Sequence, residues 1–136
     1  MSNQASISRI NPPELGEPPG YSQIVEVAAG RLFFIAGQTA LNAAGEVVGK
    51  GDFAAQAEQV FHNLGVALKA GRCTAANLVK LTVFMRDMND LGAYREARNR
   101  FFATVSPPAA PAITLIEVSR LYGPDFLIEI EAVAAA

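Results

Sequence analysis

Residues 53–70 place their apolar side chains on a single side of a helical repeat, and this constrains the fold more than any other feature of the chain. Five apolar residues recur at spacings of four, three, four and four positions: Phe53, Ala57, Val60, Leu64 and Leu68. This is the pattern of an amphipathic α-helix, with Asp52 as its expected N-cap and Gly71 as its expected C′ residue. A helix with one apolar stripe has to bury it, so the remaining chain must supply a partner layer.

Strands are the expected partner layer, because five other segments have the composition of strands. These segments are residues 24–28, 32–36, 78–86, 112–118 and 126–133. The first two are separated by Ala29-Gly30-Arg31, which predicts a hairpin, and a turn over 120–125 joins the last two as a second antiparallel pair. Alternation in the central segment predicts that Val79, Leu81, Val83 and Met85 share one face.

A second helix is predicted over about 91–104, with Asn89 or Asp90 as its cap. The resulting order, β-β-α-β-α-β-β, predicts an α+β fold in which a mixed sheet carries two helices on one face. The other face would remain uncovered in a monomer although it presents apolar residues. Apolar residues form 51% of the chain and charged residues 18%, below the roughly 25% of an average soluble chain. We therefore expect a sheet from another subunit to cover this face.

The beginning of the chain is rich in proline. The four prolines of this segment are Pro12, Pro13, Pro18 and Pro19. Because a proline ring fixes φ and removes a donor, we expect residues 1–19 to form an extended arm without a helix or a central strand. A length of 136 residues suits one domain, and the chain has no internal repeat, so residues 1–136 are predicted to form a single domain.

Charge and rare residue types narrow the function classes. The net charge is −2, which does not favour electrostatic binding to nucleic acid. A lone cysteine, Cys73, fits a reducing compartment, and a lone histidine, His62, argues against a histidine-rich metal site and is expected at the surface. The polar first residues and the lack of a long apolar run predict a cytoplasmic protein that does not span a membrane.

Glutamates in the predicted C-terminal strands are candidates for chemistry. Glu129 and Glu131 are two residues apart and therefore share one strand face, and Glu117 belongs to the preceding strand. Such residues usually line a solvated edge or a subunit seam. The alternative is that one carboxylate stands over a small pocket as a general base or anchors a water molecule. Both interpretations are open from the sequence.

Other candidates lie near the predicted strand and helix ends. Tyr21, at the end of the arm, either caps an edge of the core or donates its phenol hydrogen to a ligand. Gly37 marks either a bulge or a place where a backbone N–H approaches a ligand. Arg95 and Arg98 are three residues apart and share a helix face, which is either solvated or brings one guanidinium to an anionic ligand across a subunit boundary.

Several segments, taken in order, resemble the Rid family, also known as YjgF/YER057c/UK114. They are residues 20–23 (GYSQ), 34–38 (FIAGQ), 78–90 (LVKLTVFMRDMND), 116–121 (IEVSRL) and 128–134 (IEIEAVA). The resemblance implies a chorismate-mutase-like α+β fold and a homotrimer, with three sheets forming a central barrel and small-molecule clefts between subunits. In the best-understood branch, these clefts hydrolyse enamines or imines to a keto acid and ammonia without a metal or cofactor.

The chain departs from that deaminase branch after the proline-rich connector. Ile113 stands where the branch has the arginine that holds the substrate carboxylate, and Thr114 and Leu115 follow it. An isoleucine cannot form a bidentate pair with a carboxylate. Either Arg95 or Arg98 supplies a substitute, or the ligand is not an amino-acid-derived imine acid.

The resemblance therefore implies a site in which Glu129 orients water and Tyr21 assists, and it leaves three functions to weigh. The residues expected to bind substrate are Gly37, Ile113, Thr114, Leu115, Arg95 and Arg98. The first function is hydrolysis of an enamine, an imine or a related labile metabolite. The second is binding of small metabolites without catalysis. The third is the endoribonuclease or translation-inhibitor role of some relatives, which the acidic balance disfavours.

Overall fold

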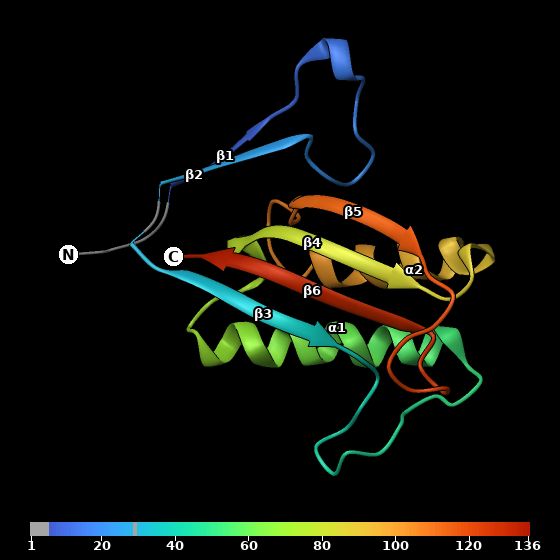
Figure 1. The fold of residues 1–136 in the computed structure, drawn as a ribbon. Coiled ribbons are helices and arrows are strands. Elements are labelled where there is room, and N and C mark those ends of the chain that lie inside the picture. Colours follow the sequence, from blue (N-terminus) through green and yellow to red (C-terminus); the bar gives the residue numbers. More distant parts are fainter. Residues whose placement is uncertain (1–5, 29) are drawn as a thin grey trace.

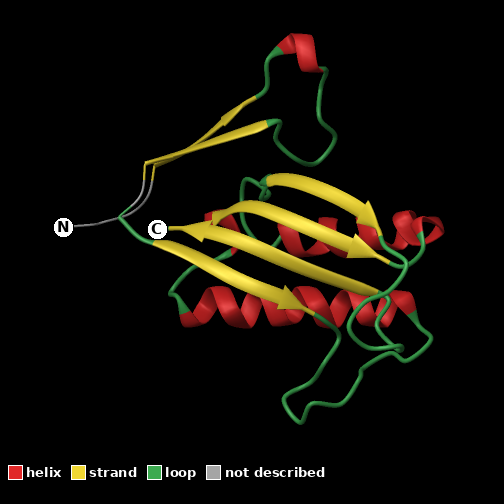
Figure 2. Ribbon diagram, in the orientation of Figure 1, coloured by secondary structure: helices red, strands yellow, loops and turns green. Residues whose placement is uncertain are grey.

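Two helices lie on one face of a four-stranded sheet in the computed structural model, which describes residues 6–28 and 30–136 (Figure 1). The strands lie in the order β3 (Leu32–Gln38), β6 (Ile128–Ala135), β4 (Leu78–Met85) and β5 (Ala112–Glu117). The helices are α1 (Phe53–Ala70) and α2 (Leu91–Phe102), and both lie on the same side of the sheet (Figure 2). Since β4 and β5 are parallel and the other pairs antiparallel, the prediction of an α+β fold with a mixed sheet is confirmed.

Helix α1 begins and packs as its sequence pattern predicts. The Asp52 carboxylate accepts a hydrogen bond from the backbone N–H of Ala55 at 3.2 Å. The five residues of the predicted stripe are all buried. At the other end, Gly71 has φ of −86° and Arg72 takes the positive φ. Glycine is required at 71 for a different reason than expected, because a Cβ there would lie 2.8 Å from the ring of Phe33.

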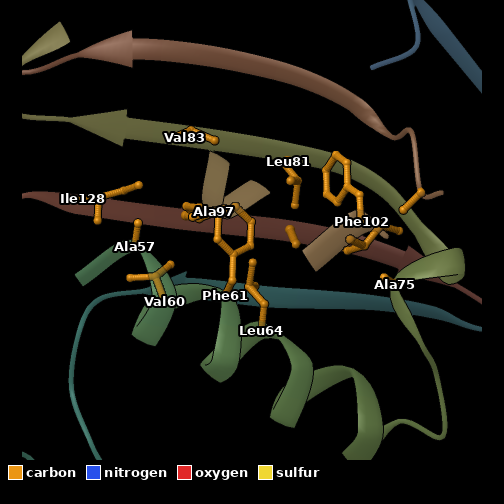
Figure 3. Close-up of a cluster of buried hydrophobic side chains, with 14 of the residues drawn as sticks. Ala57, Val60, Phe61, Leu64, Ala75, Leu81, Val83, Ala97, Phe102 and Ile128 are labelled. Carbon is orange, nitrogen blue, oxygen red and sulfur yellow. The ribbon is translucent and has the colours of Figure 1, made fainter. Parts of the chain in front are cut away.

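The core lies between the sheet and the two helices (Figure 3). Val60 and Leu64 of α1 meet Leu81 and Ile128 of the sheet there, and none of the four is exposed to solvent. Burying such an aliphatic side chain contributes about 1.5–3 kcal/mol relative to leaving it exposed. This packing fixes the positions of β4 and β6 relative to α1.

Strand β4 follows the predicted alternation only over its second half. Leu81, Val83 and Met85 are buried, but Leu78 is buried as well, in place of Val79. The pairing of β4 with β6 shifts register between Leu78 and Lys80. A shift of one residue exchanges the two faces of a strand, which explains the difference.

The predicted hairpin between residues 24–28 and 32–36 is wrong. Strand β2 (Ile24–Ala28) pairs with β1 (Ser6–Ile10) as a separate two-stranded sheet, and β3 pairs with β6 (Figure 1). Ala29, in the predicted turn, lies outside the described residues. The prolines fall in the connection between β1 and β2, so they leave β1 free to pair within the segment expected to be only an extended arm.

The predicted antiparallel pair at the end of the chain is also wrong. Strand β5 pairs in parallel with β4, and β6 lies between β3 and β4. Alternation of apolar residues identifies the buried face of a strand but does not identify its neighbour. Three short 3-10 helices complete the structure: Pro13–Leu15, Ala75–Asn77 and Met88–Asp90. The first lies in the segment that was predicted to contain no helix, because proline fits the first positions of a helical turn.

The sheet face opposite the helices carries large apolar side chains, as expected. Phe34 is 77% exposed, Leu32 is 54% exposed and Ile116 is 38% exposed. Phe33 and Ile35, which flank Phe34, and Leu115, which precedes Ile116, pack against the core, so these exposed side chains belong to the opposite face. We call this helix-free side of the sheet the open face.

Candidate functional site

A pocket of about 230 Å³ lies between α2, strand β5 and the end of the N-terminal segment. Five of the residues predicted to form the site line it: Tyr21, Arg95, Arg98, Ile113 and Leu115. Residues from three separate parts of the chain therefore meet at one place. We call it the α2 pocket.

The N-terminal segment is held against this pocket by contacts on both of its sides. Ser22 donates its backbone N–H to the carbonyl oxygen of Pro111 at 3.0 Å, and its hydroxyl donates to the carbonyl of Ala110. Gly20 has φ of +84°, and a Cβ at that position would lie 2.7 Å from Nη2 of Arg98. Glycine at 20 thus allows both the turn and the close contact that bring Tyr21 to the pocket.

Arg98 is the buried cation of the α2 pocket. Its side chain lies over the ring of Tyr94, with Cζ 5.8 Å from the ring centroid, and only 8% of the residue is exposed. Its Nε and Nη2 atoms donate to Oδ1 of Asn99 at 3.2 and 3.1 Å. Arg95 also lines the pocket but is exposed, so the two arginines predicted to share a face differ in burial.

Tyr94 lines the same pocket and was not predicted as a site residue. Tyr94 is 1% exposed, and its hydroxyl has no hydrogen-bond partner among the described residues. Burial raises the pKa of Tyr94 to about 12, against the opposing effect of the Arg98 guanidinium. The sequence shows Tyr94 only as an apolar position of α2. Its unpaired hydroxyl could not be foreseen, because it depends on which groups surround the ring.

Glu129 and Gly37 meet away from the α2 pocket. A Cβ on Gly37 would overlap Oε2 of Glu129, so the carboxylate lies directly against the glycine backbone. The pairing of β3 with β6 shifts register between Ile35 and Gln38, which places Gly37 in a bulge. Burial raises the pKa of Glu129 above its usual value, and the charge of Glu131 raises it further.

Glu129 and the α2 pocket lie on opposite faces of the sheet and toward opposite edges of it. Ile128 and Ile130 are buried in the core, so Glu129 between them points to the open face. Ile113 packs against the core on the helix side of β5. Since β3 and β5 are the two edge strands, one copy of the chain cannot bring Glu129 and the α2 pocket to the same small ligand.

Thr114 does not lie on the same face of β5 as Ile113 and Leu115, with which it was predicted to bind substrate. It alternates with Ile113 and Leu115 and therefore points to the open face. There its hydroxyl accepts a hydrogen bond from Nζ of Lys80 at 2.6 Å. In a single copy, the structure does not bring Thr114 into the α2 pocket.

A larger pocket of about 640 Å³ lies beside Gly37, between α1 and the loop that follows β3. Asn63 donates to the carbonyl oxygens of Thr39 and Leu41 at 3.0 and 2.9 Å, so its amide holds the loop on α1. The hydroxyls of Thr39 and Tyr122 are 2.6 Å apart. His62 also lines this pocket and is exposed, as predicted.

The described residues contain no group of three or more histidine, cysteine, aspartate or glutamate side chains that could hold a metal ion. No helix in residues 6–28 and 30–136 is long and apolar enough to cross a membrane.

A small α+β domain with a mixed sheet, one helix-covered face and a pocket at the edge of the sheet defines a recognisable class of protein. The family model described as Endoribonuclease L-PSP matches residues 15–136. A RutC family protein of Synechocystis is 40% identical over 109 residues, covering 79% of this chain and 81% of the relative. The 2-iminobutanoate/2-iminopropanoate deaminase of Mus musculus is 37% identical over 114 residues, covering 84% and 79%.

A solved structure agrees with these sequence comparisons. The Rid family protein YyfB from Yersinia pestis superimposes with a TM-score of 0.84 at 35% identity, covering 96% of this chain and 98% of that one. The chain therefore belongs to the Rid (YjgF) family, as its sequence motifs predicted.

Proposed function

We propose that this protein hydrolyses a small imine or enamine in clefts between the subunits of a homotrimer, without a metal or cofactor. The observation that carries the proposal is the position of Glu129. Its carboxylate lies in the Gly37 bulge on the open face, while the α2 pocket is on the other face and at the other edge. A second copy that docks its β5 edge near the Gly37 bulge would complete the site.

The open face supports an assembly of several copies. Phe34 and Leu32 expose most of their surface there, and an exposed apolar patch of this kind typically marks an interface. In a closed ring of three copies, each open face would be covered by its neighbours and each contact would contain one cleft. The mouse relative named as an imine deaminase adds support for the chemistry.

In the proposed reaction, ionised Glu129 accepts a proton from a water molecule as the water oxygen attacks the carbon of the C=N bond. The nitrogen takes up a proton, and a carbinolamine forms. The proton that the nitrogen took up comes from solvent. Glu129 then returns its own proton to the amino group, the C–N bond breaks as the carbinolamine hydroxyl gives its proton to solvent, and a carbonyl compound and ammonia leave. A carboxylate with a raised pKa suits both proton transfers better than an exposed one. Tyr21 would orient the substrate from the neighbouring copy.

The test is to generate imines of simple amino acids with an amino-acid oxidase and to follow their loss as semicarbazide adducts. Wild type should accelerate hydrolysis, and Glu129→Gln should abolish the acceleration while leaving the fold intact. Ile113→Arg introduces the arginine that the deaminase branch has at this position. Its activity shows whether the cleft can hold a substrate carboxylate through that arginine. If both wild type and Ile113→Arg are inert towards a panel of imines, the proposal is contradicted.

A second candidate function is binding of a small metabolite without turnover. The isoleucine at 113, where the deaminase branch has its arginine, favours this alternative. Equilibrium binding that persists unchanged in Glu129→Gln, with no product formed by either protein, would support it over hydrolysis.

A further inference from the structure

Arg98 is a buried guanidinium that forms no ion pair within the part of the chain that the structure describes. The two ion pairs found there are at the surface, between Lys50 and Asp125 and between Arg100 and Glu58. Among the described residues, the hydrogen-bond acceptor of Arg98 is the neutral amide oxygen of Asn99, and its guanidinium also lies over the ring of Tyr94. Removing a charge from water is costly unless an opposite charge compensates for it. A buried cation without such a partner is therefore a site prepared for an anion.

The hydroxyl of Tyr94 is a second donor in the same place. It is buried, it has no hydrogen-bond partner among residues 6–28 and 30–136, and it lines the α2 pocket together with Arg98. Leaving a buried hydroxyl unpaired costs about 1–3 kcal/mol. At the same small cavity, Arg98 thus lacks a counter-ion and the neighbouring Tyr94 hydroxyl lacks a hydrogen-bond partner among the described residues.

We infer that Arg98 and Tyr94 bind the carboxylate of a small aliphatic acid in the α2 pocket. A guanidinium can meet a carboxylate with two parallel hydrogen bonds, and a phenol can donate a further one. The cation then comes from helix α2, in place of the position now occupied by Ile113. The use of this carboxylate site for the substrate of hydrolysis rests on the proposed function, but the binding itself does not.

The dimensions and walls of the pocket define the ligand. A volume of about 230 Å³ suits a small molecule with a few carbon atoms beyond the carboxylate. Leu91, Ile113 and Leu115 provide apolar walls that suit a short aliphatic chain. One buried cation balances one negative charge, which favours a monoanionic carboxylate over phosphate.

Arg95 is the competing candidate for the clamp. It lines the pocket but is exposed, so water already solvates its charge and a bound anion would gain less from it. The inference therefore assigns the carboxylate to Arg98 and predicts a smaller effect at Arg95.

The experiment is isothermal titration of the intact protein with butanoate, using butanamide as the neutral analogue and inorganic phosphate as a different anion. Butanoate should bind, and butanamide and phosphate should bind more weakly. Arg98→Met should weaken butanoate binding by about tenfold or more, since bonds to charged groups are the strong ones. Arg100→Met removes a surface arginine from the same helix and should leave binding unchanged.

Tyr94→Phe is a second variant, and it tests the inference even if Arg98→Met fails to fold. It should weaken butanoate binding about fivefold through loss of one hydrogen bond, while the melting temperature without ligand stays the same or rises. Equal binding of butanoate and butanamide, or unchanged butanoate affinity in Tyr94→Phe, would overturn the inference. So would a larger effect of Arg95→Met than of Arg98→Met. Binding without turnover would leave the inference intact and count against the proposed hydrolysis alone.

Discussion

The carboxylate of Glu129 lies against the backbone of Gly37 so closely that no side chain fits between them. The pairing of β3 with β6 shifts register between Ile35 and Gln38, which places Gly37 in a β-bulge at this point. A residue that the sequence marks as a bend and a residue that it marks as a strand glutamate thus form one unit. The unit faces away from the core, where a second copy of the chain can reach it.

Gly37→Ala should displace the Glu129 carboxylate and reduce imine hydrolysis about 100-fold, because a shift of about 1 Å in a reacting group has that effect. Stability should change little, by about 1 kcal/mol or less, because the glutamate is partly exposed and can move. Activity and thermal unfolding together check this. Gly92→Ala is the matched control, since a Cβ there meets no atom within 4 Å, and it should retain activity and gain up to about 1 kcal/mol in helix α2.

The pH dependence of turnover should report the ionisation of Glu129. The reaction needs the ionised carboxylate, and burial raises its pKa above the usual 4.5, with a further contribution from Glu131. Activity should therefore fall on the acidic side around a pKa higher than 4.5. Glu131→Gln removes the second cause, so it should move that fall to lower pH without abolishing activity. An acidic limb at the same pH in both proteins would show that another group controls the reaction.

The same pKa predicts a gain in stability when Glu129 is replaced. Because its pKa is raised in the folded chain, protonation of Glu129 stabilises the fold fully below the unfolded pKa, and this stabilisation is lost as the pH rises through the folded pKa. At neutral pH the ionised carboxylate is therefore unfavourable for folding. Glu129→Gln should unfold at the same or a higher denaturant concentration than wild type at pH 7, and should lose that advantage at acidic pH. Marked destabilisation of Glu129→Gln at pH 7 would contradict this.

Gln56 should prove essential for the loop that leads into β6. Its buried amide donates to the carbonyls of Gly49 and Asp125 at 3.1 and 2.8 Å and accepts from the N–H of Leu127 at 2.9 Å. Gln56→Leu should lower the free energy of unfolding by about 3 kcal/mol, since three backbone groups lose their partner. Gln38→Ala is the control, because within residues 6–28 and 30–136 that amide donates only to the carbonyl of Ala36, and it should cost much less. Urea denaturation gives both values.

Phe34 tests the proposed assembly. Wild type should sediment as a trimer, and Phe34→Glu should sediment as a folded monomer, because the charge would have to be buried in the interface. Val66→Glu places the same charge at an apolar residue of α1 that is 56% exposed, on the helix side, and it should remain trimeric. Analytical ultracentrifugation with circular dichroism distinguishes dissociation from unfolding. A trimer that persists in Phe34→Glu would place the interface elsewhere.

The sequence predicted the helices and the buried faces of the strands better than it predicted which strands pair with each other. The stripe of α1 and the Asp52 cap depend on residues within a few positions of one another, and both are found as expected. The partners of β2 and β5 depend on residues far along the chain, and alternation cannot identify them. The buried Leu78 was missed because the register shift in β4 arises from its pairing with β6.

The same difference between local and long-range features is found at the site. Tyr21, Ile113 and Leu115 were predicted through resemblance to relatives, and the fold brings them together in the α2 pocket. Burial separates Arg98 from Arg95, although the sequence places both on one helix face. The role inferred for Tyr94 arises because its hydroxyl has no partner in the described part of the chain, which only the packing of neighbouring groups determines.

Mixing two impaired variants tests most directly whether one site is built from two copies. Glu129→Gln subunits are expected to be inactive in imine hydrolysis, and Arg98→Met subunits should be slower by about tenfold or more at low substrate concentration, because each lacks one half of every cleft. After the two are unfolded together and refolded in equal amounts, about one quarter of the clefts should combine an intact Glu129 with an intact Arg98 from the neighbouring copy. Activity near that fraction of wild type is the predicted result. A mixture no more active than its separate components, prepared beside a refolded wild type that is active, would contradict the shared site.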